Sequence, residues 1–140
     1  MMYYTPLVVT DRDAVRIREL GKRLPDAGRG LPGLRDLVEQ VDAEAEIVPG
    51  TGVPANVVTM NSIVSFQDEE TGHVSRVALV YPADMSIADH RISVLSPVGR
   101  ALLGRTAGAV AEVSLPDGSE RRIRILEIHY QPEASGDFER

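Results

Sequence analysis

The spacing of hydrophobic residues changes once along this chain of 140 residues, and that change constrains the fold more than any other feature. Before the turn-forming segment 49–56, apolar side chains recur every three or four residues, which is typical of amphipathic helices. After it they alternate with polar residues, which is typical of strands in a half-buried sheet. The sequence therefore predicts an α+β protein with a helical hairpin over 1–48, a linker over 49–56 and a sheet domain over 57–140.

Two short helices are predicted in the first part. Thr10 is a suitable N-cap for a helix over about 11–24, because its side chain can accept the amide hydrogen of the third helical residue, Asp13. A Gly- and Pro-rich turn ends this helix, and a second helix is expected over about 34–46. The two helices should lie antiparallel as a short coiled coil, only ~20 Å long at 1.5 Å per residue. Each helix has one apolar stripe, so the pair must pack on the rest of the protein or on a partner.

The second part reads as strands with one short helix among them. Strands are expected over residues 57–67, 74–81, 91–95, 109–115 and 120–130. Ser96 can cap a helix that begins at Pro97, where the missing amide hydrogen costs nothing, and Gly104 can end that helix. The alternation slips between Ile125 and Leu126, which predicts a bulge in the last strand.

The composition disfavours several kinds of partner and cofactor. A net charge of -6 argues against direct binding to nucleic acid, because a phosphate backbone needs a basic surface. Aromatic residues make up only 4%, so a base-stacking platform is not expected either. There is no cysteine and the three histidines lack ligand spacing, so we expect no metal and no cofactor. An acidic chain suits a basic protein surface, although the charge can also serve solubility alone.

The chain carries no recognisable catalytic motif. No serine lies in a GxSxG turn, and no Gly-rich loop precedes Lys22, which is the only lysine. The acidic run Asp68-Glu69-Glu70 could hold a divalent ion, but a solvated hairpin turn explains it better. The helix start at Ser96 could bind an anion, but N-capping accounts for the same residue. We therefore do not expect an enzyme.

The sequence also gives expectations for location and assembly. No basic-then-apolar leader opens the chain, and no apolar run reaches the ~18 residues of a membrane helix. We therefore expect a cytoplasmic protein with no membrane partner. We expect a monomer, and an unmatched apolar stripe on the helices leaves self-association open.

Three motifs resemble a known family. They are Val58-Thr59-Met60-Asn61-Ser62, Leu79-Val80-Tyr81-Pro82 and the segment from Ser96 to Gly104. Their order and spacing resemble the C-terminal domain of the Gre transcription elongation factors (GreA/GreB). They come closer still to the regulators of nucleoside diphosphate kinase (Rnk), short relatives of those factors that bind bacterial RNA polymerase. The resemblance implies an FKBP-like antiparallel-sheet domain that carries a short coiled coil, with RNA polymerase as its partner.

The resemblance also implies roles for individual residues. In Gre factors a long coiled coil enters the secondary channel of the polymerase, and acidic residues at its tip help to hold a metal ion for RNA cleavage. The globular domain docks on the channel rim, partly through the turn that aligns with Ser96 and Pro97. We therefore expect partner binding at Ser96 and Pro97, with Arg100 on the same exposed edge. Asp26 stands alone at the coiled-coil tip and cannot supply the several oxygens that two-metal chemistry needs.

Three functions stay open at this point. The first is a non-catalytic transcription regulator that binds RNA polymerase near the secondary channel and competes with Gre-type factors. The second is a regulator of nucleotide metabolism, at the level of nucleoside diphosphate kinase, that acts by another route. The third, an enzyme, is the least favoured. Prolyl isomerases of FKBP-like fold line their pockets with aromatic residues, whereas Phe66 and Phe138 are the only phenylalanines of this chain, so this activity is disfavoured.

Overall fold

A computed structural model describes residues 7–23 and 33–138 and contains helices, short 3-10 turns and strands in two sheets. The helices are α1 (Asp11–Arg23), α3 (Leu34–Glu44) and α4 (Pro97–Leu102), and the 3-10 turns are η1 (Gly50–Gly52) and η2 (Pro82–Asp84). The strands are β1 (Leu7–Thr10), β2 (Ala45–Val48), β3 (Ile63–Asp68), β4 (Val74–Val80), β5 (Arg91–Ser93), β6 (Val110–Ser114) and β7 (Glu120–Tyr130).

The two predicted N-terminal helices are present. The predicted cap of α1 is confirmed, because the Thr10 hydroxyl accepts the amide of Asp13 at 3.1 Å. Arg18 of α1 pairs with Asp42 of α3, and Gly21, further along α1, lies close to Val38, which is earlier in α3. Helices α1 and α3 are therefore antiparallel. The coiled-coil description itself stays a prediction.

The predicted end of the second helix is wrong by two residues. Helix α3 stops at Glu44, and the next four residues form β2, which takes the place of the predicted end of the helix. Strand β2 pairs in parallel with β1, so that Leu7 lies opposite Ala45. The pairing joins segments far apart in the sequence and binds the ends of the helical pair into a small two-stranded sheet.

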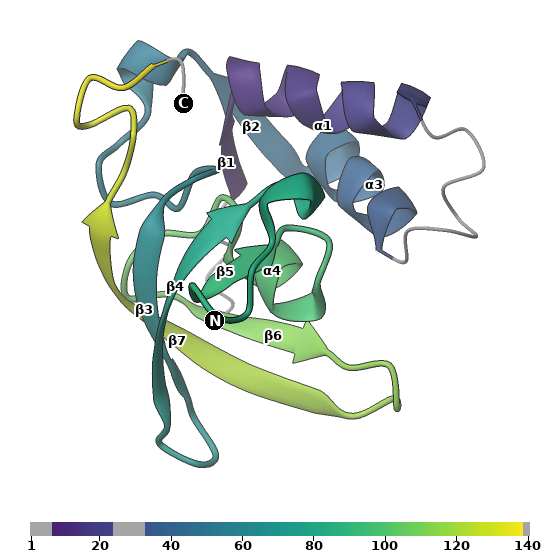
Figure 1. Ribbon diagram of the computed structural model, residues 1–140, viewed down its shortest axis with the longest axis vertical. Helices are drawn as coiled ribbons and strands as arrows, with labels where there is room; N and C mark the ends of the chain where they lie inside the picture. Colours follow the sequence, from purple (N-terminus) through teal and green to yellow (C-terminus); the bar gives the residue numbers. More distant parts are fainter. Residues whose placement is uncertain (1–6, 24–32, 139–140) are drawn as a thin grey trace, which may run out of the picture.

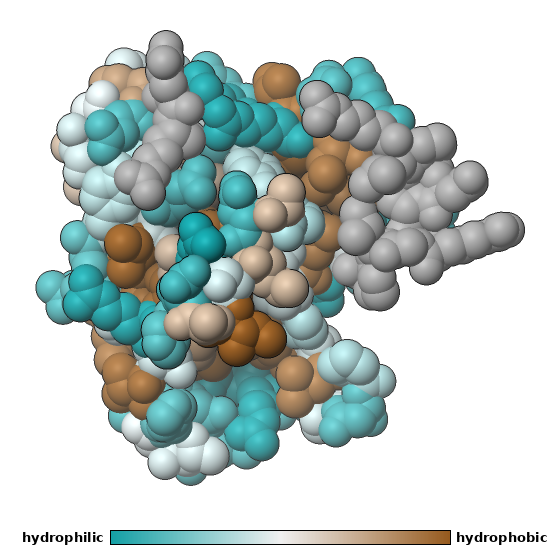
Figure 2. Space-filling model, in the orientation of Figure 1, coloured by the Kyte–Doolittle hydropathy of each residue, from teal (hydrophilic) through white to brown (hydrophobic). Residues whose placement is uncertain are grey.

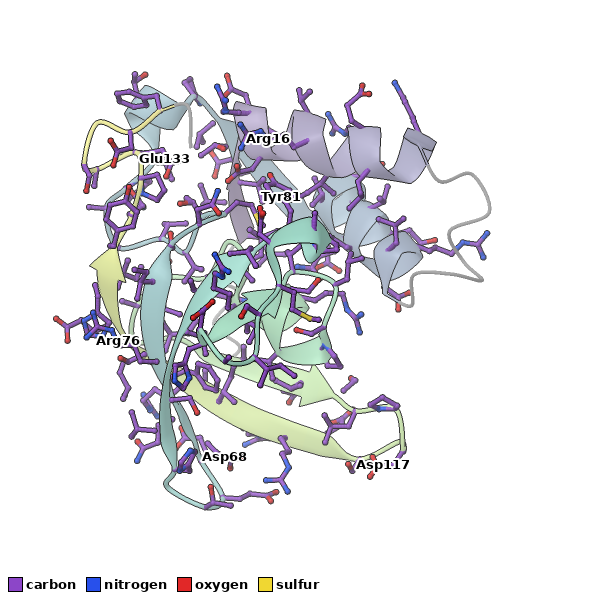
Figure 3. The ribbon with its side chains drawn as sticks, viewed as in Figure 1. Arg16, Asp68, Arg76, Tyr81, Asp117 and Glu133 are labelled. Carbon is purple, nitrogen blue, oxygen red and sulfur yellow. The ribbon has the colours of Figure 1, made fainter. Side chains whose placement is uncertain are left out.

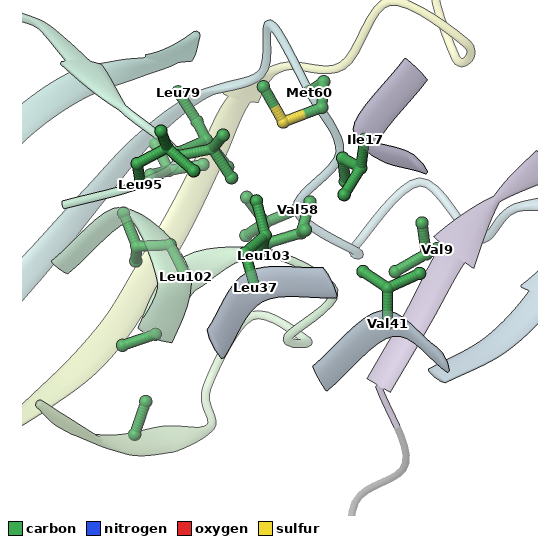
Figure 4. Close-up of a cluster of buried hydrophobic side chains, with 14 of the residues drawn as sticks. Val9, Ile17, Leu37, Val41, Val58, Met60, Leu79, Leu95, Leu102 and Leu103 are labelled. Atoms are coloured by element: carbon green, nitrogen blue, oxygen red, sulfur yellow. The ribbon is translucent and has the colours of Figure 1, made fainter. Parts of the chain in front are cut away.

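One hydrophobic cluster connects the helices to the larger sheet. Ile17 from α1 and Leu37 from α3 are fully buried with Met60, Leu79 and Leu103 (Figure 4). Burial of that kind contributes ~1.5–3 kcal/mol for each large aliphatic side chain. The helical pair therefore packs on the rest of the protein, as its single stripes predict. The division into 1–48, 49–56 and 57–140 stays a prediction.

The larger sheet curls below the helical pair, with its strands in the order β5-β4-β3-β7-β6 (Figure 1). Three of its pairings are antiparallel, as predicted, but β4 and β5 run parallel. The parallel pairing follows from the long connection through η2, which carries the chain back to the start of a new strand. The likeness to FKBP stays a prediction.

The first predicted strand of this domain starts later than the alternation suggested. Residues 57–62 form an irregular segment, and β3 begins only at Ile63. The segment turns at Asn61, whose φ of 67° is left-handed and suits an asparagine. The Thr59 amide donates to the Ser62 hydroxyl at 3.0 Å, so side chains replace a strand ladder here.

Two finer predictions are confirmed. Ser96 caps α4 through a 3.0 Å hydrogen bond from the amide of Gly99, and Gly104 follows the helix with φ 78°. In the β3–β7 pairing Phe66 lies opposite Ile125 and Ser65 opposite Glu127, which leaves Leu126 as the extra residue of a bulge.

Candidate functional site

The predicted docking turn is held in place by several hydrogen bonds. The Ser96 hydroxyl donates to the Ser93 carbonyl at 2.7 Å while it accepts the Gly99 amide. Gly99 lies so close to β5 that an added Cβ would overlap the Ser93 carbonyl oxygen. Ser96 and Pro97 are therefore half-buried on a turn whose backbone is fixed by the sheet.

We predicted that Arg100 lies on an exposed edge, but the structure places it differently. It is half-buried, and its guanidinium donates to the Leu95 carbonyl at 2.8 Å and lies against Gly33, at the start of α3. Its own carbonyl accepts from the Gln40 side chain at 3.1 Å. Arg100 thus connects α4 to α3, and the reason is the close approach of the helical pair, which spacing along the sequence does not reveal. Asp26, the predicted coiled-coil tip, lies outside the described residues.

A buried polar cluster that the sequence interpretation missed lies under α1. Asp13 is 2% exposed, and its carboxylate accepts the Met60 amide at 3.1 Å and the Tyr81 hydroxyl at 3.4 Å. The Arg16 guanidinium lies 5.9 Å from the centre of the Tyr81 ring (Figure 3). One signal for this burial was present: Asp13 precedes Ile17 by four residues and so shares the buried side of the helix.

Burial sets the protonation of this cluster. Removal from water raises the pKa of Asp13 from 3.8 to about 6, and the Glu133 carboxylate adds to the rise. Hydrogen bonds from Met60 and Thr10 and the Arg16 charge oppose it. The pKa of Tyr81 is also raised, first by burial and then by the Asp13 charge. Asp13 therefore titrates around pH 6, while Tyr81 stays protonated.

The C-terminal segment closes the same cluster. The Thr59 hydroxyl donates to the Glu133 carboxylate at 2.7 Å, and the side-chain amide of Gln131 donates to the Val57 carbonyl at 2.8 Å. These bonds hold the irregular segment before β3 against the end of β7. The cluster connects three parts of the chain through buried hydrogen bonds, so we assign it a structural role.

Two features are absent from the described residues. No group of three or more His, Asp or Glu side chains in residues 7–23 and 33–138 is placed to hold a metal ion. Over the same residues, no helix has both the length and the apolar character needed to cross a membrane.

The fold and motifs define a transcription-factor domain. The family described as "Transcription elongation factor, GreA/GreB, C-term" matches residues 53–130. A solved structure, a prokaryotic transcription elongation factor GreA/GreB from Nitrosomonas europaea, superposes with a TM-score of 0.70 at 37% identity, over 89% of this chain and 99% of that one. The chain belongs to the GreA/GreB transcription elongation factor family.

Within the family, a short relative matches along nearly the whole chain. The chain is 39% identical to a regulator of nucleoside diphosphate kinase (Rnk) from Escherichia coli strain K12, over 94% of this chain and 95% of that protein. It is 40% identical to transcription elongation factor GreA from Clostridioides difficile, but this match spans 65% of the chain and 57% of that factor. The resemblance to Rnk and to GreA/GreB is thus confirmed.

Proposed function

We propose that this protein is a non-catalytic transcription regulator that binds RNA polymerase near the secondary channel and competes there with Gre-type factors. The observation that carries the proposal is the retention of a Gre C-terminal domain over residues 53–130 beside a much shortened helical pair. In this proposal the domain over 53–130 docks on the polymerase, and the described helices α1 and α3 are too short to form a long arm.

The docking residues in this proposal are Ser96 and Pro97. Their turn ends β5 and begins α4, and its hydrogen bonds fix the backbone before any partner arrives. A preformed turn loses little conformational entropy on binding. Arg100 contributes by holding α4 against α3, so its role is indirect.

The absence of cleavage in this proposal follows from reach and chemistry. Helix α1 has 13 residues and α3 has 11. At 1.5 Å per residue the longer one extends only ~20 Å. Asp26 is the sole carboxylate in the segment between them, and a catalytic metal pair needs several oxygen ligands.

Binding to core polymerase tests the proposal. Fluorescently labelled protein is titrated with core enzyme, and an unlabelled Gre factor is then added as competitor. We expect binding that the Gre factor displaces, weakened by Pro97→Ala and unchanged by Asp26→Ala. If Asp26→Ala weakens binding and Pro97→Ala does not, the docking surface lies on the helical pair. If none of the three proteins binds, the polymerase proposal is wrong.

A second function is favoured by one observation, the name of the relative from Escherichia coli, which is a regulator of nucleoside diphosphate kinase. In this alternative the protein controls nucleotide metabolism without polymerase. Copurification from cells separates the two, because only the first predicts core polymerase among the retained proteins.

A further inference from the structure

Strand β4 has a free edge along its first half. On one side it pairs with β3 from Val74 to Ala78, but on its other side β5 pairs only with the stretch from Ala78 to Val80. Figure 1 shows the lower part of β4 continuing past β5 to the β3–β4 hairpin. The chain returns to β4 only at His90, whose left-handed φ of 55° turns it onto the edge where β5 begins.

The hydrogen bonds at the two ends of β4 show which of its backbone groups face this free edge. The Asp68 amide donates to the His73 carbonyl at 2.9 Å, just before the strand begins. The Leu79 amide donates to the Ser62 carbonyl at 3.0 Å, near the end of the strand. In an antiparallel pair, residues that bond the partner strand alternate with residues that face away from it. The odd-numbered residues of β4 therefore face β3, and the even-numbered ones face the free edge.

Two even-numbered residues, Val74 and Arg76, thus present an amide and a carbonyl each to the free edge. The next one, Ala78, shows how such groups are satisfied, because its amide donates to the His90 carbonyl at 2.9 Å. Val74 and Arg76 have no such neighbour among residues 7–23 and 33–138. Unpaired backbone groups in a row are a template on which a further strand can pair.

A hollow of about 620 Å³ lies along the free edge. It is bounded by β4 on one side and by Asp89 and His90 on the other, so it lies in line with β5. The free stretch, residues 74–77, is ~13 Å long at ~3.3 Å per residue. In Figure 2 hydrophobic side chains are scattered among hydrophilic ones over the sheet, without one broad apolar patch. Backbone hydrogen bonds, more than apolar area, are therefore what this edge offers to a partner.

The charged groups at the hollow favour an acidic segment. Arg76 is exposed and makes no ion pair or side-chain hydrogen bond with any residue in 7–23 or 33–138. Asp89 also lines the hollow, but its carboxylate is engaged by Arg91 at 3.3 Å. The two histidines of the lining, His73 and His90, are neutral or cationic and never anionic. The charge that lacks a partner is therefore positive.

We propose that the free edge of β4 binds an extended segment of a protein partner as an added strand. The backbone of the segment pairs with Val74 and Arg76, where β5 is absent. Its acidic side chains lie on the outer face of the sheet beside Arg76, which is exposed. Its apolar side chains lie on the opposite face beside Val77, which lines the hollow and is 8% exposed. The segment is thus one in which apolar and acidic residues alternate.

Proline substitutions test which amides are free. Val74→Pro removes an outward amide and leaves the bonds to β3 intact, because proline is accepted where the lost N–H faces away from the sheet. Ser75→Pro removes an amide that bonds β3. We expect the thermal midpoint of Val74→Pro to stay within about 3 °C of the wild type and that of Ser75→Pro to fall by ~5 °C or more. Equal losses would place the Val74 amide in the β3 pairing and overturn the proposal.

Binding is measured by titrating the full chain, labelled with nitrogen-15, with a capped seven-residue peptide in which valine and glutamate alternate. We expect saturable binding with a dissociation constant on the order of 1 mM, and larger shifts at the Val74 and Arg76 amides than at Ser75. Val74→Pro should weaken binding roughly tenfold, since one hydrogen bond is lost. The same peptide with N-methyl groups on its three central amides should not bind. Absence of saturable shifts in the wild type, or equal binding of the N-methylated peptide, would show that no strand is added.

A charge exchange tests the role of Arg76. We expect Arg76→Glu to weaken binding of the glutamate peptide roughly fivefold and to favour the same peptide with lysine in place of glutamate. Arg35→Glu makes the same change in net charge at an exposed position of α3 and should stay within about twofold of the wild type. Equal effects of the two substitutions would mean that net charge, and not this edge, selects the peptide. Because the probe is a peptide, these outcomes are independent of polymerase binding and of the proposed function.

Discussion

The carboxylate of Asp13, in the first turn of α1, accepts a hydrogen bond from the amide of Met60, which lies 47 residues further along the chain. This bond joins the helical pair to the irregular segment before β3. The same carboxylate receives the Tyr81 hydroxyl from the end of β4. One buried side chain thus connects the helices to the sheet.

The first prediction concerns Asp13 and pH. Its pKa is about 6 in the folded protein and 3.8 without the fold, so the folded protein binds more protons between these values. The contribution of Asp13 to stability therefore falls as pH rises from about 4 to about 6, by ~3 kcal/mol in all. Asp13→Asn can still accept the Met60 amide and carries no charge. We expect this variant to be at least as stable as the wild type at pH 7.5.

Urea denaturation of both proteins at pH 4 and at pH 7.5 checks this prediction. The free energy of unfolding of Asp13→Asn minus that of the wild type should be larger at pH 7.5 than at pH 4. An unchanged difference between the two pH values would mean that Asp13 does not titrate in this range.

The second prediction concerns the core under α4. Leu103 is 1% exposed and belongs to the central cluster, so Leu103→Ala should lower the free energy of unfolding by ~2–5 kcal/mol. Leu126, at the β7 bulge, is 41% exposed, and Leu126→Ala serves as the matched control with an expected change within ~0.5 kcal/mol. Equal denaturation midpoints for Leu103→Ala and wild type would show that α4 does not pack as described.

The third prediction concerns the close contact between α4 and β5. An added methyl group at Gly99 overlaps the Ser93 carbonyl, so Gly99→Ala should destabilise the protein by ~1–3 kcal/mol. Gly50→Ala is the control, since an added Cβ there meets its nearest neighbour, Phe138, at an ordinary 3.6 Å. Thermal unfolding measures both, and a Gly99→Ala midpoint equal to that of Gly50→Ala would rule out the close contact.

The fourth prediction separates the role of Arg100 from that of the docking turn. Because Arg100 bonds the Leu95 carbonyl and lies against Gly33, Arg100→Ala should lower the free energy of unfolding by ~1–3 kcal/mol. Pro97→Ala should leave stability within ~0.5 kcal/mol, because alanine is tolerated at the first helical position. Denaturation curves check both. An Arg100→Ala curve equal to that of the wild type would show that Arg100 does not hold α4 against α3 and is exposed, as the sequence suggested.

Local chemistry made part of the fold predictable. Thr10 before α1, Ser96-Pro97 before α4 and Gly104 after it each act within a few residues, so the sequence was sufficient to place them. The bulge at Leu126 was equally visible, because an extra residue breaks the alternation of the strand itself.

The parts that were missed depend on contacts between distant segments. In the sequence, residues 45–48 continue the helical pattern, and only their pairing with β1 makes them a strand. Asp13 has the position of an ordinary acidic residue in the first helical turn, and only the contacts with Met60 and Tyr81 bury it. Arg100 looked like a surface residue because only the folded chain brings Gly33 beside it.

The most direct test of the central claim uses backtracked elongation complexes that are cleaving their transcript with the help of a Gre factor. The protein is added in increasing amounts with magnesium, alone and together with the Gre factor, and the RNA length is followed. We predict no shortening by the protein alone and a concentration-dependent loss of Gre-stimulated cleavage. RNA shortening by the protein alone above background, or Gre-stimulated cleavage that persists at saturating protein, would contradict the account.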